Sequence, residues 1–150
     1  MDWATARDFC ALHHDKLAVA SSSTANDAIA RVVRSVPTAA SQVVWLGGTA
    51  MADPAGSARG IGRYVGVPEL SGWYWYPDVQ LGSFASQAYS NWGHAQPNNG
   101  GNPAQPGNDY CLMIRTPPDG RAFLWADWNC ANDESFVCEH VESPPPPPPP

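Results

Sequence analysis

The sequence predicts an α+β domain in which two helices come early, and short strands joined by long loops come late. The chain has 150 residues, of which 43% are apolar, so it suits one domain with a core of ordinary size. Helical spacing of apolar residues is confined to residues 2–36, and the later apolar runs have the length of strands. Seven tryptophans indicate that large aromatic rings organise much of the fold.

The first predicted helix covers residues 2–14, with Asp2 as its N-cap. The residues that follow helical spacing in it are Trp3, Ala6, Phe9 and Cys10. The second helix covers residues 21–36, where Ser23 or Thr24 can cap the start and Pro37 marks the end. Its expected apolar face consists of Ile29, Val32, Val33 and Val36.

Short apolar runs bounded by Gly, Pro and Asn predict the strands. The predicted strands cover residues 16–20, 42–48, 72–78, 110–115, 122–127 and 135–141. We expect a loop over residues 49–72 and a turn at residues 116–120. Because residues 47–109 hold long loops within a compact domain, this part of the chain is a candidate for function.

The charge of the chain excludes two classes of partner. Net charge is −6 and Lys16 is the only lysine, so the chain has no basic patch for nucleic acid or for an anionic membrane surface. No apolar run approaches the roughly 18 residues of a membrane span.

Four cysteines, Cys10, Cys111, Cys130 and Cys138, are present, and none belongs to a Cys-x-x-Cys pair. This spacing argues against zinc and thioredoxin-like sites and favours two disulfides formed in an oxidising, extracellular compartment. Four cysteines allow three pairings, and their spacing alone does not select one.

Residues 143–150, "SPPPPPPP", differ from the domain at residues 1–142. Seven consecutive prolines predict a polyproline II segment about 22 Å long, the start of a Pro-rich stalk. One interpretation is a stiff spacer. The other follows from a resemblance to the hydroxyproline-rich glycoproteins of plant and green-algal extracellular matrices, which implies hydroxylated, glycosylated prolines.

Several motifs agree in order and spacing with one family. They are "WATARDFC", "VVWLGG", "GWYW", "YSNW", "QPN", "LWADWNC" and "CANDESFVCE". Over residues 3–139 the chain resembles a C-type lectin-like domain. The resemblance implies that fold, with two helices, short antiparallel strands and a long ligand loop. It also implies the disulfides Cys10–Cys138 and Cys111–Cys130, and a first strand before Trp3 that is missing here.

The resemblance implies a calcium and sugar site in the ligand loop. Its ligands would be Gln96, Asn98, Asp109 and Asp127, with Asn108 as the alternative to Asp109. Ca²⁺ takes six to eight hard oxygens, which carboxylates and amides supply. Ala126 stands where the family has Asn and offers no side-chain oxygen. We therefore expect weak calcium binding, in the millimolar range of extracellular sites.

Two functions remain open at this point. The first is an extracellular carbohydrate-binding module whose partners are glycans or glycosylated matrix proteins, with Trp128 as either a sugar-stacking ring or a core residue. The second is a calcium-independent structural component of a matrix, cell wall or filament, in contact with neighbouring copies. An enzyme is not expected, since His13, His14 and His94 have no partners arranged for acid–base chemistry.

Overall fold

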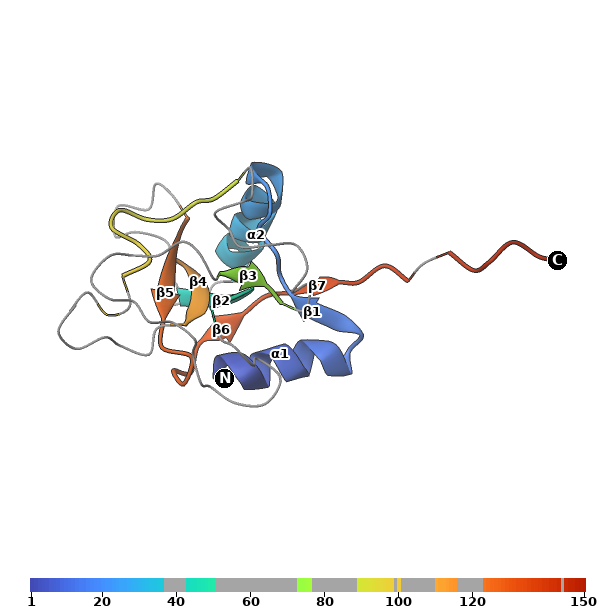
Figure 1. Cartoon of the computed structure of the whole chain (residues 1–150), viewed down its shortest axis with the longest axis horizontal. Helices are drawn as coiled ribbons and strands as arrows, with labels where there is room; N and C mark the ends of the chain where they lie inside the picture. Colours follow the sequence, from blue (N-terminus) through green and yellow to red (C-terminus); the bar gives the residue numbers. More distant parts are fainter. Residues whose placement is uncertain are drawn as a thin grey trace.

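The computed structural model describes residues 1–36, 43–50, 73–76, 89–98, 100, 110–115, 123–143 and 145–150. In these residues the helices are α1 (Trp3–Leu12) and α2 (Ser23–Ser35). The strands are β1 (Asp15–Leu17), β2 (Val43–Thr49), β3 (Tyr74–Trp75), β4 (Cys111–Arg115), β5 (Leu124–Trp128), β6 (Ser135–Phe136) and β7 (Cys138–His140). The expected α+β architecture is confirmed, with the two helices on opposite sides of the strands (Figure 1).

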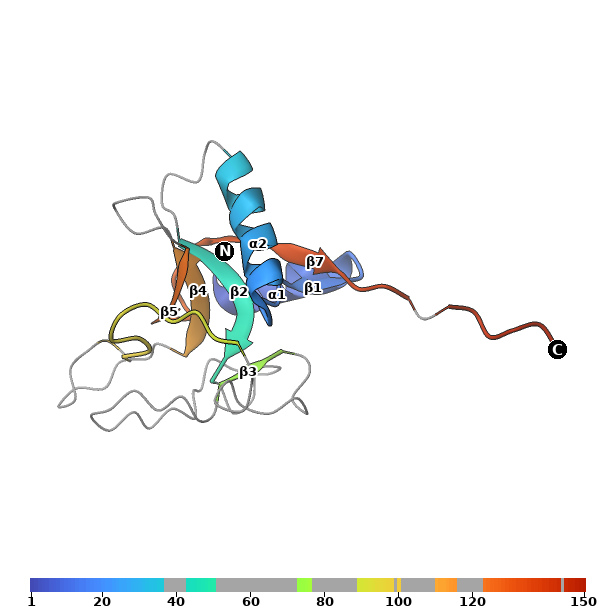
Figure 2. The same ribbon diagram turned by 90° about the horizontal axis from the view of Figure 1, so that it is seen from above.

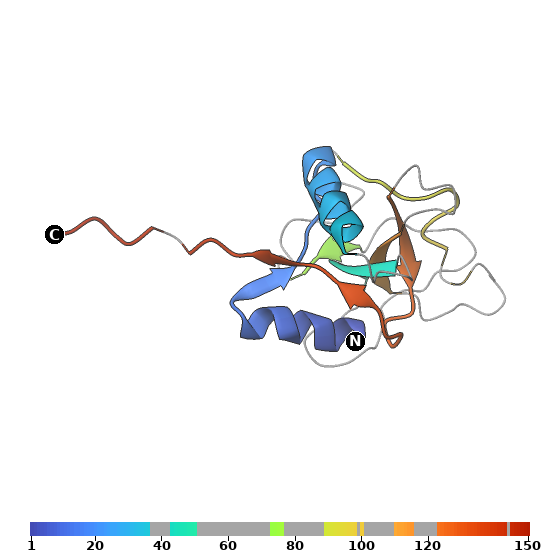
Figure 3. The same cartoon turned by 180° about the vertical axis from the view of Figure 1, so that it is seen from behind.

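The larger sheet has the strand order β3-β2-β4-β5, and all of these pairs are antiparallel. β6 adds to β2 in parallel, with Val44 opposite Ser135, a pairing that the sequence did not indicate. β1 and β7 form a separate antiparallel pair, in which Leu17 lies opposite Cys138. β7, near the end of the folded part, therefore lies beside β1, near its beginning (Figure 3).

α1 begins as the sequence predicts. The Asp2 carboxylate accepts a hydrogen bond of 2.8 Å from the Thr5 backbone N–H, which satisfies one of the free donors in the first turn. Three of the four apolar residues at helical spacing are buried: Trp3, Ala6 and Cys10. Phe9 is an exception, with 40% of its surface exposed, because it lies at the rim of the helix face and packs edge-on against Phe136.

α2 differs from the prediction in its cap and in its buried face. Ser22, rather than Ser23 or Thr24, caps the helix, and its hydroxyl accepts from the Ala25 N–H at 3.1 Å. The buried face consists of Asn26, Ile29, Ala30 and Val33. Val32 and Val36 are about half exposed, since tertiary contacts turn the helix toward the side that carries Asn26 and Ala30.

The last predicted strand, residues 135–141, is two strands. β6 pairs with β2 and β7 pairs with β1, so the chain changes partner at Val137. The Val137 carbonyl accepts from the Ala18 N–H at 2.8 Å and thus stays satisfied between the two ladders. The sequence does not reveal this change of partner, because the two short strands together look like one continuous strand.

Tryptophans fill the core, as the sequence indicates. The fully buried ones are Trp3, Trp45, Trp73, Trp75 and Trp125. Buried indole N–H groups require acceptors, and here they come from distant parts of the chain. Trp3 donates to the Leu46 carbonyl at 2.8 Å, and Trp125 donates to the Asn26 Oδ1 at 2.9 Å. These bonds tie α1 to β2 and α2 to β5.

Both expected disulfides are present, and all four cysteines are therefore paired. Cys10–Cys138 joins α1 to β7 across 128 residues. Cys111–Cys130 joins β4 to the turn after β5 across 19 residues. In the chain-entropy account, a loop as long as the first contributes up to about 5 kcal/mol by restricting the unfolded chain.

Several predictions fall outside the described residues: the loop at residues 51–72, the turn at residues 116–120, Pro37 and Asp109. The described tail, residues 145–150, is exposed and extends away from the body of the domain beyond β7 (Figure 1). Its polyproline II form and its glycosylation stay predictions. Among the helices that the structure describes, none is long and apolar enough to cross a membrane.

Gly47 occupies a position where β2 passes close to the end of β1. A Cβ atom there would lie 2.9 Å from the Leu17 carbonyl oxygen, a backbone atom that cannot move aside. Gly47→Ala should lower the free energy of unfolding by about 1–3 kcal/mol in urea denaturation. In Gly93→Ala, the matched control, the nearest atom lies at 3.4 Å and the loss should be much smaller. Equal losses would contradict the clash.

The Asp2 cap also predicts a dependence of stability on pH. Hydrogen bonds from Thr5 lower the pKa of the Asp2 carboxyl below its ordinary value of 3.8. The stabilisation is therefore complete above that value and is lost as pH falls through the lower folded pKa. Asp2→Ala should destabilise the domain by about 1 kcal/mol at pH 7, and by progressively less below about pH 4. Asp2→Asn keeps a capping side chain, so its free energy of unfolding in denaturation experiments should be close to that of the natural chain. If the loss in Asp2→Ala stays constant down to pH 2, the prediction is contradicted.

Candidate functional site

The ligand-loop segment is held against β5 by backbone hydrogen bonds. The Trp125 N–H donates to the Asn91 carbonyl, and the Trp125 carbonyl accepts from the Gly93 N–H, both at 2.8 Å. These bonds form a parallel bridge between Trp92 and Trp125. Figure 2 shows this segment, residues 89–98 in yellow, passing beside β5. The sequence alone predicts a loop here, and the structure places its first residues in register with a strand.

A tight turn follows the bridge and positions Gln96. The Gln96 N–H donates to the Gly93 carbonyl at 3.1 Å, and Ala95 adopts a left-handed φ of 56°. This conformation costs a non-glycine residue about 1–2 kcal/mol, so the surrounding contacts must hold it. The Gln96–Pro97 peptide bond is cis.

The turn leaves one buried polar atom without a partner in the described part of the chain. Gln96 Oε1 is buried and accepts no hydrogen bond. A buried amide oxygen without a partner costs about 1–3 kcal/mol, which a ligand that meets the oxygen would recover. The family resemblance implies that Gln96 is a ligand residue. In the structure its side-chain oxygen is a buried acceptor without a donor.

Asn98 and Asp127 are joined directly. Asp127 is 2% exposed, and its Oδ1 accepts from the Asn98 N–H at 2.9 Å. The Asn98 Oδ1 accepts from the Gly100 N–H at 3.1 Å, which closes a local turn. The structure therefore brings together two of the predicted residues, Asn98 and Asp127, with Gln96 two residues before Asn98 in the same segment. Asp109 lies outside the described residues.

The oxygen ligands fit Ca²⁺ in type and fall short in number. Gln96 and Asn98 supply amide oxygens and Asp127 supplies one carboxylate, while Ca²⁺ takes six to eight oxygens. Ala126, which pairs with Met113 and is 4% exposed, adds no side-chain oxygen. In the described residues, no group of three His, Cys, Asp or Glu side chains is placed to hold a metal. These ligands suit a weak site only.

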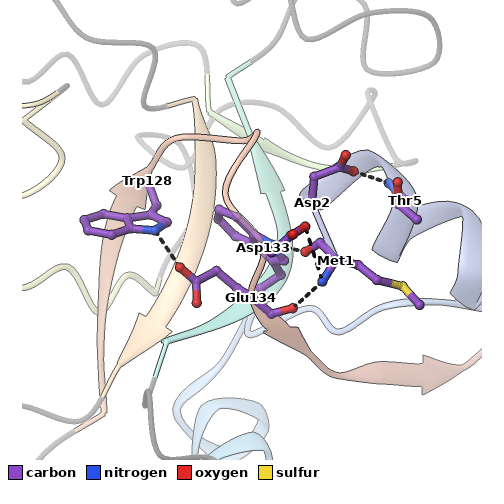
Figure 4. Close-up of polar contacts among 7 residues, drawn as sticks. Met1, Asp2, Thr5, Trp128, Asp133 and Glu134 are labelled. Atoms are coloured by element: carbon purple, nitrogen blue, oxygen red, sulfur yellow. Dashed lines mark hydrogen bonds and ion pairs between the residues drawn. The ribbon is translucent and has the colours of Figure 1, made fainter.

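Trp128 is positioned by a different set of contacts. It follows Asp127 at the end of β5. Its indole N–H donates to Glu134 Oε1 at 2.9 Å, and its ring is partly buried against the core. Figure 4 shows Glu134 between Trp128 and Met1. The Met1 ammonium group donates to the Glu134 carbonyl, and the Met1 carbonyl accepts from the Glu134 N–H.

Two residues that support the loop were not predicted from the sequence. Asn91 donates from its Nδ2 to the Phe123 carbonyl at 2.6 Å and fixes the entry into the loop. Asn26 in α2 accepts from the Trp125 indole and fixes the far side of that ring. The position of Asn26 within an amphipathic helix could have indicated its role, since a buried amide in a helix needs a hydrogen-bond partner. His94, at the tip of the turn, is exposed.

Comparison with known proteins gives three relevant similarities. The curated protein "Perlucin" of Haliotis laevigata is 36% identical over 56 residues, which is 37% of this chain and 32% of Perlucin. Human lithostathine has a TM-score of 0.62 at 22% identity, over 94% of this chain and 77% of that one. The mouse scavenger receptor C-type lectin carbohydrate-recognition domain has a TM-score of 0.60 at 22% identity, over 94% and 84%.

The structural likenesses confirm the predicted fold, and Perlucin matches over about a third of its length. The family profile "Lectin C-type domain" matches residues 1–140, which is nearly the whole of the folded part. The chain therefore belongs to the C-type lectin domain family.

Proposed function

We propose that this domain is an extracellular carbohydrate-binding module on a Pro-rich glycoprotein, with its site at Gln96, Asn98, Asp109 and Asp127. The buried, unpartnered Gln96 Oε1, two residues before the Asn98 that bonds Asp127, is the observation that carries the proposal. Polar groups that converge in a loop held by a rigid strand are typical of a ligand site. The two disulfides fit an oxidising compartment outside the cell.

Calcium would supply a hard cation that sugar hydroxyls can coordinate. Gln96, Asn98, Asp109 and Asp127 would hold it, and their own role is to orient the ion and the sugar. Asp109 and Asp127 would supply the negative charge, and the Asn98 N–H fixes one oxygen of Asp127 in place. Because Ala126 adds no side-chain oxygen, binding should be millimolar. Trp128 is the aromatic surface nearest in sequence to this site.

Substitution at Ala126 tests the calcium part of the proposal. Ala126→Asn supplies the missing side-chain oxygen and should tighten Ca²⁺ binding about tenfold in calorimetric titration, since affinity follows the ligand set. Ala131→Asn, at an exposed position after Cys130, is the matched control and should leave binding unchanged. No heat at millimolar Ca²⁺ from the natural chain or from Ala126→Asn rules out the calcium site.

Glycan-array binding tests the sugar part. Gln96→Ala removes the unpartnered oxygen and should reduce the signal by about tenfold or more, the loss expected for a hydrogen bond at a buried site. His94→Ala alters the same turn at an exposed side chain and should keep the signal. If both variants bind like the natural chain, the loop is not the sugar site.

A second candidate function, a calcium-independent contact surface, is favoured by the hydrogen bond that Asp127 already makes. One Asp127 oxygen already accepts from the Asn98 N–H, and Ala126 adds none, so the loop can also serve as a calcium-independent contact surface. In this alternative the chain is a structural component of a matrix, cell wall or filament, bound to neighbouring copies or glycosylated proteins. Persistent assembly in EDTA would support it. A soluble monomer with unmodified prolines, by mass spectrometry and light scattering, would count against it.

A further inference from the structure

A polar pocket lies between α2 and the segment that leads into the ligand loop. Its volume is about 450 Å³, within the range of small-molecule sites. The wall from α2 contains Asn26, Asp27, Arg31 and Arg34. Tyr89, Asn91 and Phe123 form the opposite wall. Figure 3 shows that the yellow segment begins beside α2 before it passes to β5. Neither Gln96 nor Asp127 lines this pocket.

Asn26 gives the pocket a fixed hydrogen-bond donor. It is 5% exposed, and its Oδ1 accepts from the Trp125 indole N–H at 2.9 Å. Because an indole nitrogen only donates, this bond determines which end of the amide is oxygen. The amide nitrogen donates to no group in the described residues, nor is it among the fully enclosed atoms without a partner. A ligand in the pocket can therefore accept from it.

The opposite wall adds an acceptor and an aromatic hydroxyl. Asn91 uses its Nδ2 for the Phe123 carbonyl, which leaves its Oδ1 as an acceptor. The Tyr89 ring packs edge-on against Trp125, with centroids 5.7 Å apart. Burial and the nearby Asp27 carboxylate raise the pKa of Tyr89 above its ordinary value of 10.0, so its hydroxyl keeps its proton at neutral pH. Donors and acceptors beside aromatic rings match the hydroxyls and the apolar face of a sugar ring.

The rim of the pocket carries two arginines that lack a carboxylate partner. Asp27, Arg31 and Arg34 are spaced so that they lie along one side of α2. Asp27 and Arg31 have the spacing of a helix ion pair, yet the ion pairs found in the described residues include neither Arg31 nor Arg34. The Arg34 guanidinium lies 4.7 Å from the centre of the Phe123 ring, a cation–π contact that keeps it at the pocket.

We propose that this pocket is a second saccharide subsite that binds an acidic sugar, one that carries a carboxylate or a sulfate group. Arg31 and Arg34 bind the anionic group through charge-assisted hydrogen bonds, which are stronger than neutral ones. Asn26, Tyr89 and Asn91 bind the ring hydroxyls. The subsite uses no metal, and it does not depend on whether the loop at Gln96 binds sugar.

Titration of the whole ¹⁵N-labelled chain in EDTA tests this subsite. The probes are methyl β-glucuronide, its neutral counterpart methyl β-glucoside, and glucose 6-sulfate. We expect the two acidic sugars to shift the amide signals of α2 and of residues 89–91, with an affinity about tenfold or more above that of the glucoside. The affinity should fall as salt is added, because the contact with Arg31 is exposed.

Three variants locate the binding. Arg31→Gln should weaken glucuronide binding about tenfold, and Tyr89→Phe should weaken it several-fold without disturbing the contact of the ring with Trp125. Arg115→Gln removes an exposed arginine from β4 and is the matched control, with unchanged binding. Gln96→Ala should also bind the glucuronide normally, which separates this site from the proposed loop site. Equal affinity for glucuronide and glucoside, or equal loss in Arg31→Gln and Arg115→Gln, overturns the proposal.

Discussion

Trp125 is the residue on which the arrangement of this domain depends. Its backbone N–H and carbonyl hold the segment at residues 91–93, and its indole N–H holds Asn26. Its ring meets those of Trp75, Tyr89 and Trp92 edge-on, a geometry that favours aromatic pairs. One fully buried side chain in β5 therefore connects α2, β3 and the ligand loop. Few replacements could preserve both the ring contacts and the indole donor.

The same residue lies between the two polar sites. Its backbone sets where the turn to Gln96 begins, and Asp127 follows two positions later in β5. On the other side, the indole N–H donates to the Asn26 oxygen. This bond leaves the Asn26 amide nitrogen as a donor for a ligand in the pocket at Arg31. Both regions thus depend on Trp125, through its backbone for the entry into the loop and through its indole for Asn26.

The sequence predicted the fold well because its strongest signals are local or covalent. Asp2 caps α1, β2 and β4 coincide with apolar runs, and the pairing of the cysteines followed from the family motifs. The predictions were wrong where tertiary contacts determine which side chains are buried. The buried face of α2 turned from Val32 toward Asn26, because Asn26 bonds a tryptophan 99 residues away. For the same reason, the sequence indicated Gln96 and Asp127 by their motifs but gave no sign of the pocket at Arg31, whose walls come from three separate segments.

The Cys10–Cys138 bond has a mechanical consequence. It joins positions near the two ends of the folded part and encloses nearly all of the residues between them. A pull applied between Met1 and the proline tail would pass through α1, the sulfur atoms and β7, which is a short covalent route. β4 and β5 lie off this covalent route, whereas β2 is tied to its start, because the Trp45 indole donates to the Met1 carbonyl. Both polar sites therefore lie outside the covalent route that would carry tension between the two ends of the folded part.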